Sequence, residues 1–232
     1  MTHDSIEQLI DLLNKGELSD RVFVAALTEV VHFAKVWMEE PKGGIAGEGS
    51  YEFFFITNGS PLYVAAVLDM VNDLHVFVKN DHRGKGYLTK AMHEGVLPWL
   101  YQSGRKKQRV TFEESKVLDY CVRNWGFSKT GDFEAKKDLS IYSKVPKITL
   151  NHQGLSWDAV GEIRRKMDRA KLYLQMVREQ VQMAYGDCNE LYIETIQQDI
   201  EYIPGEVEEL IEKSNRAQPP IPLLIDQVRS LK

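Results

Sequence analysis

The chain has 232 residues, of which 43% are hydrophobic and 27% charged, and its formal net charge is −5. This is the composition of a globular protein with its own core, and the net charge excludes a generic polyanion binder. The two cysteines, Cys121 and Cys188, stand in no CxxC or Cys/His cluster, so we expect no disulfide framework and no metal site. No stretch approaches the roughly 18 apolar residues of a membrane span, so we expect no membrane partner and a cytoplasmic location.

The first third of the chain is predicted to pass from helices into strands. Residues 4–14 have apolar side chains at helical spacing, and Gly16 stands at the position of a C-terminal cap. Residues 19–39 are predicted as a second helix, buried on more than one side because its apolar residues spread widely. Residues 41–50 contain four glycines and are predicted to form a loop.

The middle third is rich in aromatic and β-branched residues, which favour strands. Three strands are predicted in a row at 51–56, 62–71 and 74–79, with a hairpin turn at Asn58-Gly59. A helix follows the turn at 80–86, and Pro98 is predicted to kink or end it. Then come a strand at 109–113, a short helix closed by Gly126, and two more strands at 127–135 and 138–145.

The segment from Leu74 to the helix after Gly86 has the order strand, glycine-rich turn, helix. Such a turn brings backbone N–H groups together, and the start of the helix adds unpaired donors and a partial positive charge, so the arrangement suits a phosphate group. Glycines at 84 and 86 let a ligand approach the backbone without meeting a Cβ atom. The spacing fits neither a P-loop nor the dinucleotide-binding fingerprint.

This segment, VKNDHRGKGYLTKAM, resembles the pyrophosphate motif of GNAT acyltransferases, (Arg/Gln)-x-x-Gly-x-(Gly/Ala). Arg83 and Gly86 occupy the first two fixed places and Leu88 the third, while an alternative register runs Asp81-x-x-Gly84-x-Gly86. The downstream segment ESKVLDYCVRNWGF resembles the next landmark of the family, a short helix that ends in Gly126-Phe127. The resemblance covers about residues 17–146.

The resemblance implies an α/β GNAT-like fold with a mixed central sheet flanked by helices, over a domain of residues 1–150. It also implies that acetyl-CoA is the acyl donor and lies against a strand that splays from its neighbour. The residues expected to contact acetyl-CoA are Phe77, Val78, Lys79, Arg83, Gly84, Lys85, Gly86, Tyr87 and Leu88.

Transfer to an amine requires a base, for which Glu113 or Glu114 is the first candidate and Asp73 the next. Strand alternation allows only one of the two glutamates to face the cleft. The family usually has a thiolate-protonating tyrosine four residues before the glycine of Gly126-Phe127, but here that position holds Val122. Tyr120 is the nearest candidate acid, although a two-residue offset turns it about 200° around the helix.

Residues 151–232 are predicted as a helical, coiled-coil-like extension with a proline-rich tail. Its apolar residues follow alternating steps of four and three at Ile163, Met167, Ala170, Leu174, Val177, Val181 and Ala184. A second helix is predicted to stop at Pro204-Gly205. Basic residues cluster early in the extension, and nine acids without Lys or Arg follow from Asp187 to Glu212.

The sequence thus predicts an acetyl-CoA-dependent N-acetyltransferase with an unknown amine acceptor. It forms a homo-oligomer, or binds a helical partner, through residues 155–215; a helix packed on its own domain is the alternative, and a nucleic-acid partner is not expected. The competing hypothesis is a GNAT-like module without catalysis, with a structural or interaction role inside a viral or macromolecular assembly, such as a phage virion.

Overall fold

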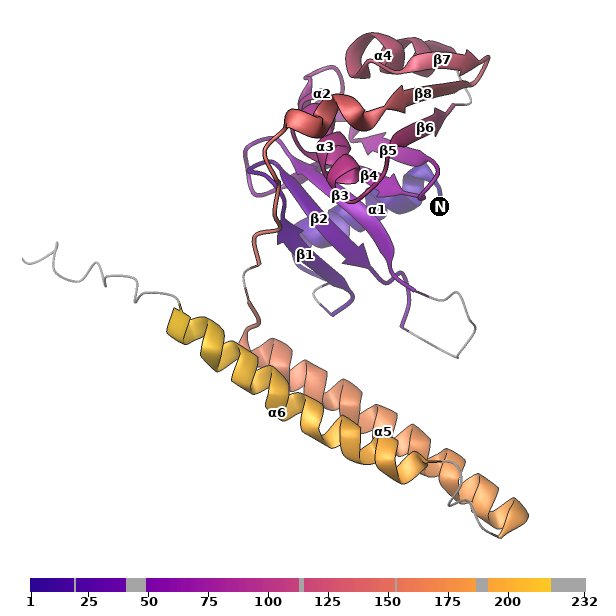
Figure 1. Cartoon of the computed structure of the whole chain (residues 1–232), viewed down its shortest axis with the longest axis vertical. Coiled ribbons are helices and arrows are strands. Elements are labelled where there is room, and N and C mark those ends of the chain that lie inside the picture. The colour runs from indigo at the N-terminus through magenta and orange to yellow at the C-terminus, as the bar shows by residue number, and fades with distance from the viewer. Residues whose placement is uncertain (19, 41–48, 113–114, 153, 187–191, 218–232) are drawn as a thin grey trace, which may run out of the picture. The chain divides into compact units, whose positions relative to one another are not determined.

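The computed structural model describes residues 1–18, 20–40, 49–112, 115–152, 154–186 and 192–217. The chain forms two compact units, residues 1–152 and 153–232. All strands of the described residues lie in the first unit, and the described part of the second is a pair of long helices (Figure 1).

Helix α1 (His3–Lys15) opens the first unit at the position that the sequence predicts. The Thr2 hydroxyl accepts the Ser5 amide and the Ser5 hydroxyl accepts the Thr2 amide, which satisfies two N–H groups at the start of the helix. Gly16 ends the helix at φ 77°.

The predicted helix at 19–39 is wrong, because these residues form an antiparallel hairpin of β1 (Val22–Ala26) and β2 (Val31–Val36). The turn between them is fixed by Thr28, whose hydroxyl accepts the amides of Val30 and Val31. The widely spread apolar residues reflect a strand, β2, that pairs with a neighbour on each side. Valines line both strands, and β-branched side chains favour a pleated backbone.

The predicted strands of the middle third are present as β3 (Tyr51–Thr57), β4 (Tyr63–Asp69) and β5 (Leu74–Val78). With β1 and β2 they form a five-stranded antiparallel sheet in chain order, with β5 at one edge. The run Phe53–Ile56 is completely buried because both faces of the sheet are covered. Helix α1 packs on one face, and the helical segment that follows β5 packs on the other (Figure 1).

That helical segment continues past Pro98, so of the two predicted outcomes, a kink or an end, the helix does not end there. It consists of α2 (Tyr87–Ala91), the π-helical turn η2 (Met92–Val96) and α3 (Leu97–Gln102). A proline lacks the N–H, and its ring collides with the carbonyl four residues earlier. The wide π turn, in which the Leu97 amide donates to the Met92 carbonyl, lies just before the proline and gives the ring room.

A second, three-stranded sheet completes the unit, in the order β6 (Lys107–Thr111), β8 (Glu134–Asp138), β7 (Ser128–Gly131), with helix α4 (Ser115–Trp125) between β6 and β7 in the chain. The predicted strand at 138–145 is wrong. The Asp138 carboxylate accepts the Ser140 amide and starts the 3-10 helix η3 (Leu139–Lys144), which buries Leu139 and Tyr142 on one side.

The second unit is an antiparallel hairpin of α5 (Trp157–Tyr185) and α6 (Ile193–Ala217). The predicted stop at Pro204-Gly205 is wrong, since α6 continues for three turns beyond it. Ile200, Val207 and Ile211 on either side of the proline pack toward α5, and this contact offsets the cost of about 3 kcal/mol of a proline inside a helix.

The described residues therefore form a mixed α/β unit with two sheets, followed by a helical region. No helix within them combines the length and apolar character that crossing a membrane requires.

Candidate functional site

A cavity of about 550 Å³ lies beside the edge strand β5. Its walls come from β5, from the turn between β5 and α2, and from α4. The lining residues are His3, Val76, Phe77, Val78, His82, Arg83, Gly84, Gly86, Tyr87, Leu88, Lys116, Val117, Tyr120 and Trp125. The cavity thus gathers most of the residues that the sequence predicts to contact acetyl-CoA.

The turn between β5 and α2 depends on its two glycines. A short 3-10 turn, η1 (Asn80–His82), leads to Gly84 at φ 72° and Gly86 at φ 81°. These are left-handed conformations that side chains with a Cβ atom rarely adopt. A Cβ atom at either position would meet nothing within 4 Å, so the backbone requires these glycines and the space over them is open.

Backbone amides gather at this turn. The amides of residues 84–88 donate none of the backbone hydrogen bonds found among the described residues, and the first helical bond at the start of α2 runs from Lys90 to the Gly86 carbonyl. The first N–H groups of a helix have no partner within it. The turn therefore presents several donors where an anionic group fits.

Strand β5 has an unpaired edge on the side away from β4. The Lys79 amide donates to the Val64 carbonyl across the β4–β5 pair. Because bonded and non-bonded pairs alternate in an antiparallel ladder, the amides of Val76 and Val78 point away from β4. No described strand pairs with this edge, although the Val78 carbonyl accepts the Arg83 Nε at 3.1 Å.

Helix α4 forms the opposite wall with Lys116, Tyr120 and Trp125. The Tyr120 hydroxyl lies 2.6 Å from the Thr89 hydroxyl, a hydrogen bond that joins α4 to α2. The Trp125 ring is buried and packs edge-on against Tyr120, with 5.7 Å between ring centroids. Its indole N–H has no hydrogen-bond partner among the described residues. Tyr120 therefore does reach the cavity, while Val122 packs against the core.

The charged lining is basic. Arg83 and Lys116 contribute full positive charges, and no described lining residue is a carboxylate. Such a lining favours an anionic ligand. Cys121 lies behind the wall, where burial raises the pKa of its thiol to about 12, so it stays protonated and unreactive at neutral pH.

Asp73, the second candidate base, does not line the cavity. Its buried carboxylate accepts the amides of Leu74 at 2.8 Å and Thr111 at 3.1 Å, and also the Thr111 hydroxyl. These contacts tie the start of β5 to the end of β6. The side chain thus holds the two sheets together instead of facing a substrate.

The remaining predicted residues lie elsewhere. The Lys79 side chain forms an ion pair with Asp11 of α1, and Lys85 is exposed on the turn outside the cavity lining. Glu113 and Glu114 lie outside the described residues. Leu88 does border the cavity, but its side chain packs in the main core and is 8% exposed, so it leaves the space over the two glycines open.

Six lining residues have no counterpart in the sequence prediction, namely His3, Val76, His82, Lys116, Val117 and Trp125. His3 reaches the cavity from α1, with its ring 4.9 Å from that of His75 and 5.8 Å from that of Phe77. Lys116 and Trp125 come from α4. Trp125 directly precedes the Gly126-Phe127 landmark, and this position is the signal in the sequence that could have pointed to it.

Comparison of the chain with models of known protein families found no match, and comparison with curated proteins found no relative.

Proposed function

We propose that the cavity binds acetyl-CoA and that the chain is an N-acetyltransferase of the GNAT type. The observation that carries the proposal is the unpaired edge of β5, which continues into the amide-rich glycine turn beside a basic cavity. The pantetheine part of coenzyme A is an extended chain with two amide groups, which can add to a strand edge. Its pyrophosphate requires N–H donors and positive charge, both of which the turn supplies.

In this proposal an outward amide of β5, from Val76 or Val78, donates to the thioester carbonyl as negative charge develops on its oxygen. The acceptor amine attacks the carbonyl carbon, the C–S bond breaks, and the thiolate leaves with a proton. Tyr120 is the described hydroxyl nearest to that task, and Thr89 orients it. The base remains Glu113 or Glu114, or a water chain in their place.

Two observations favour the second candidate, a GNAT-like module that binds a ligand or a partner without catalysis. The described lining lacks a carboxylate, and the position of the thiolate-protonating tyrosine is occupied by Val122, which packs against the core. A module of this kind would keep the cavity while losing the chemistry.

Isothermal titration calorimetry with acetyl-CoA tests the proposal. We expect the wild-type chain to bind, and Lys116→Ala to weaken binding about 10-fold or more, because a charged hydrogen bond contributes about 1.5–3 kcal/mol. Arg83→Ala should act in the same direction. Lys85→Ala is the matched control. It removes the same charge as Lys116→Ala and lies on the same turn as Arg83, but Lys85 is outside the cavity lining, so binding should stay nearly unchanged.

Absence of heat at millimolar acetyl-CoA would remove the acetyltransferase proposal. Binding without acetyl transfer to any of a panel of amines would favour the non-catalytic module. Equal losses in Lys116→Ala and Lys85→Ala would mean that coenzyme A sits outside this cavity and is held by general surface charge.

A further inference from the structure

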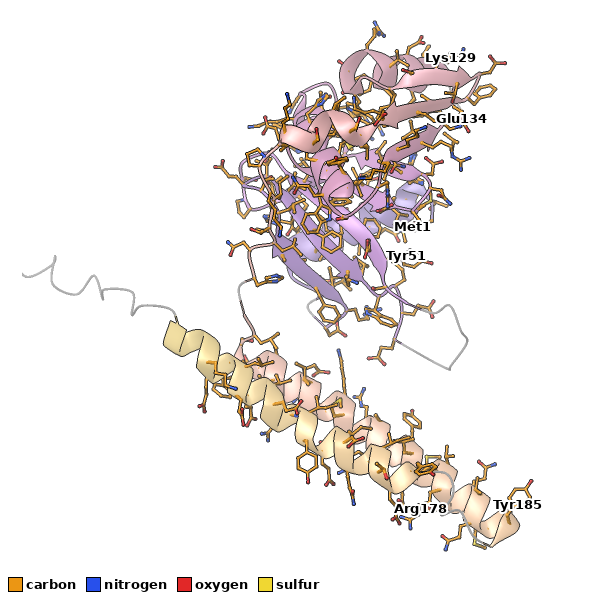
Figure 2. All side chains as sticks on the ribbon, viewed as in Figure 1. Met1, Tyr51, Lys129, Glu134, Arg178 and Tyr185 are labelled. Carbon is orange, nitrogen blue, oxygen red and sulfur yellow. The ribbon has the colours of Figure 1, made fainter. Side chains whose placement is uncertain are left out.

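The helical hairpin of the second unit is closed along one edge by ion pairs. Arg164 pairs with Glu208, Lys171 with Glu201 and Arg178 with Glu194. Each step of seven residues along α5 matches a step of seven back along α6, so the three pairs share one register. Figure 2 shows Arg178 in the C-terminal half of α5, whose last turn contains Tyr185.

The apolar residues of α6 form two rows, and only one of them is covered. Their positions follow steps of three and four at Ile193, Ile196, Ile200, Ile203, Val207 and Leu210. Residues seven apart lie on nearly the same side of a helix. The row of Ile193, Ile200 and Val207 is buried or half-buried toward α5. The row of Ile196, Ile203 and Leu210 is 44%, 37% and 65% exposed.

The exposed row lies on the edge opposite the ion pairs. At 100° per residue, Ile203 is turned about 60° from Ile200 in one direction, and Glu201 is turned about 100° in the other. On α5, Val177 and Tyr173 lie on the side of Leu174 away from Lys171 by the same reasoning. Both are largely exposed. We call these five residues, Tyr173, Val177, Ile196, Ile203 and Leu210, the open edge.

Charge separates the two helices of the hairpin. From Ile193 to Glu212, α6 carries seven acids and no Lys or Arg, whereas α5 carries six basic and four acidic residues. Beside the open edge, α6 presents Asp199 and Glu206, and α5 presents Lys166 and Arg169 together with Glu162, which lies on the same side of the helix and interacts with both cations. An open edge that joins a net acidic helix to a net basic one is complementary to itself after a two-fold rotation, which brings α6 of each copy opposite α5 of the other.

We propose that two copies of the chain pack their open edges together as an antiparallel four-helix bundle, with α6 of each copy beside α5 of the other. This arrangement covers the exposed apolar rows of both copies and places like-charged helices on the diagonals. A foreign helix of a single charge sign would match one side of the open edge and repel the other. The proposal concerns the second unit alone and does not depend on the acyltransferase function.

The seam at 163–184, predicted from the sequence to recruit a second copy, is therefore used mainly within the chain. Ile163, Met167 and Leu174 are half-buried toward α6. The surface assigned to the second copy is the neighbouring row on α6, together with the part of α5 that α6 leaves uncovered.

Sedimentation velocity on the full chain tests the proposal with two leucines of equal exposure. Leu210, in the open edge, and Leu172, on another side of α5, are both 65% exposed. We expect the wild-type chain to be a dimer. Leu210→Asp should weaken dimerisation about 100-fold or more, because it places an unpaired carboxylate in an apolar contact. Leu172→Asp should remain a dimer.

Circular dichroism should show that both variants keep their helix content, and Ile196→Asp provides a second substitution in the open edge. A monomeric wild type overturns the proposal. So does a chain that Leu172→Asp dissociates, or one that stays dimeric with both Leu210→Asp and Ile196→Asp.

Discussion

Asp73 is the residue whose role differs most between sequence and structure. A carboxylate between two strand-forming segments of a proposed acyltransferase is a reasonable candidate base, yet its oxygens accept two amides and a hydroxyl. We expect Asp73→Ala to lower the free energy of unfolding of the first unit by about 2–4 kcal/mol, because it removes the carboxylate that accepts the amides of the buried Leu74 and of Thr111. Urea denaturation followed by tryptophan fluorescence measures this, since Trp125 is buried in that unit.

The exposed Asp132, on the β7–β8 turn, is the matched control for Asp73. Its side chain is 92% exposed and pairs with Lys129, so Asp132→Ala should change stability by less than about 0.5 kcal/mol. A stable Asp73→Ala protein that has lost acetyl transfer would reverse this interpretation and restore Asp73 as a base.

The residues that the sequence placed well are those whose role follows from the local backbone. Gly84 and Gly86 were identified because a strand, a tight turn and a helix leave few other uses for two closely spaced glycines. His3 and Lys116 could not be found in this way. They reach the cavity from α1 and α4, far from the turn in sequence, and only the tertiary fold brings them there.

At the scale of elements, the sequence predicted α1, β3, β4 and β5 because periodicity and end signals agree in each. The failures at 19–39 and at Pro204 arose where two local signals disagreed. In the first, apolar residues spread over all sides of a helical wheel, which fits a buried helix and an interior strand equally well; pairing with β3 decided it. In the second, proline opposed an apolar pattern that continued, and packing on α5 prevailed.

The proline in α6 gives a direct test of that balance. Pro204→Ala restores a backbone N–H that can donate to the Ile200 carbonyl, and it removes a ring from the helix interior. We expect it to raise the free energy of unfolding of the hairpin by about 1–3 kcal/mol, measured as ellipticity at the helical minimum during thermal melting. Gly205→Ala should stabilise in the same direction by up to about 1 kcal/mol. Loss of stability in Pro204→Ala would mean that α6 ends at residue 203 in solution, as its sequence suggests.

At the scale of the whole molecule, each of the two units is stabilised internally by a different balance of interactions. The first unit has two apolar clusters, one on each face of the five-stranded sheet, which together contain most of its buried side chains. The hairpin has only a narrow seam, in which Val160, Ile193 and Ile211 are its buried apolar residues among those described. Its ion pairs are partly exposed, so each contributes little to stability. The hairpin should therefore be the less stable unit.

These differences predict two unfolding transitions with different dependence on protein concentration. The helical signal comes mostly from α5 and α6, which are 29 and 25 residues long, and the fluorescence change comes mostly from Trp99 and Trp125 in the first unit. Because the proposed bundle joins two chains, mass action should raise the midpoint of the helical transition as concentration increases. The fluorescence midpoint should stay constant, since the first unit has its own core.

Leu210→Asp should remove the concentration dependence of the helical transition and leave the fluorescence transition in place. Coincident transitions that ignore concentration would show that the hairpin gains its stability from the first unit of the same chain, and would count against the bundle.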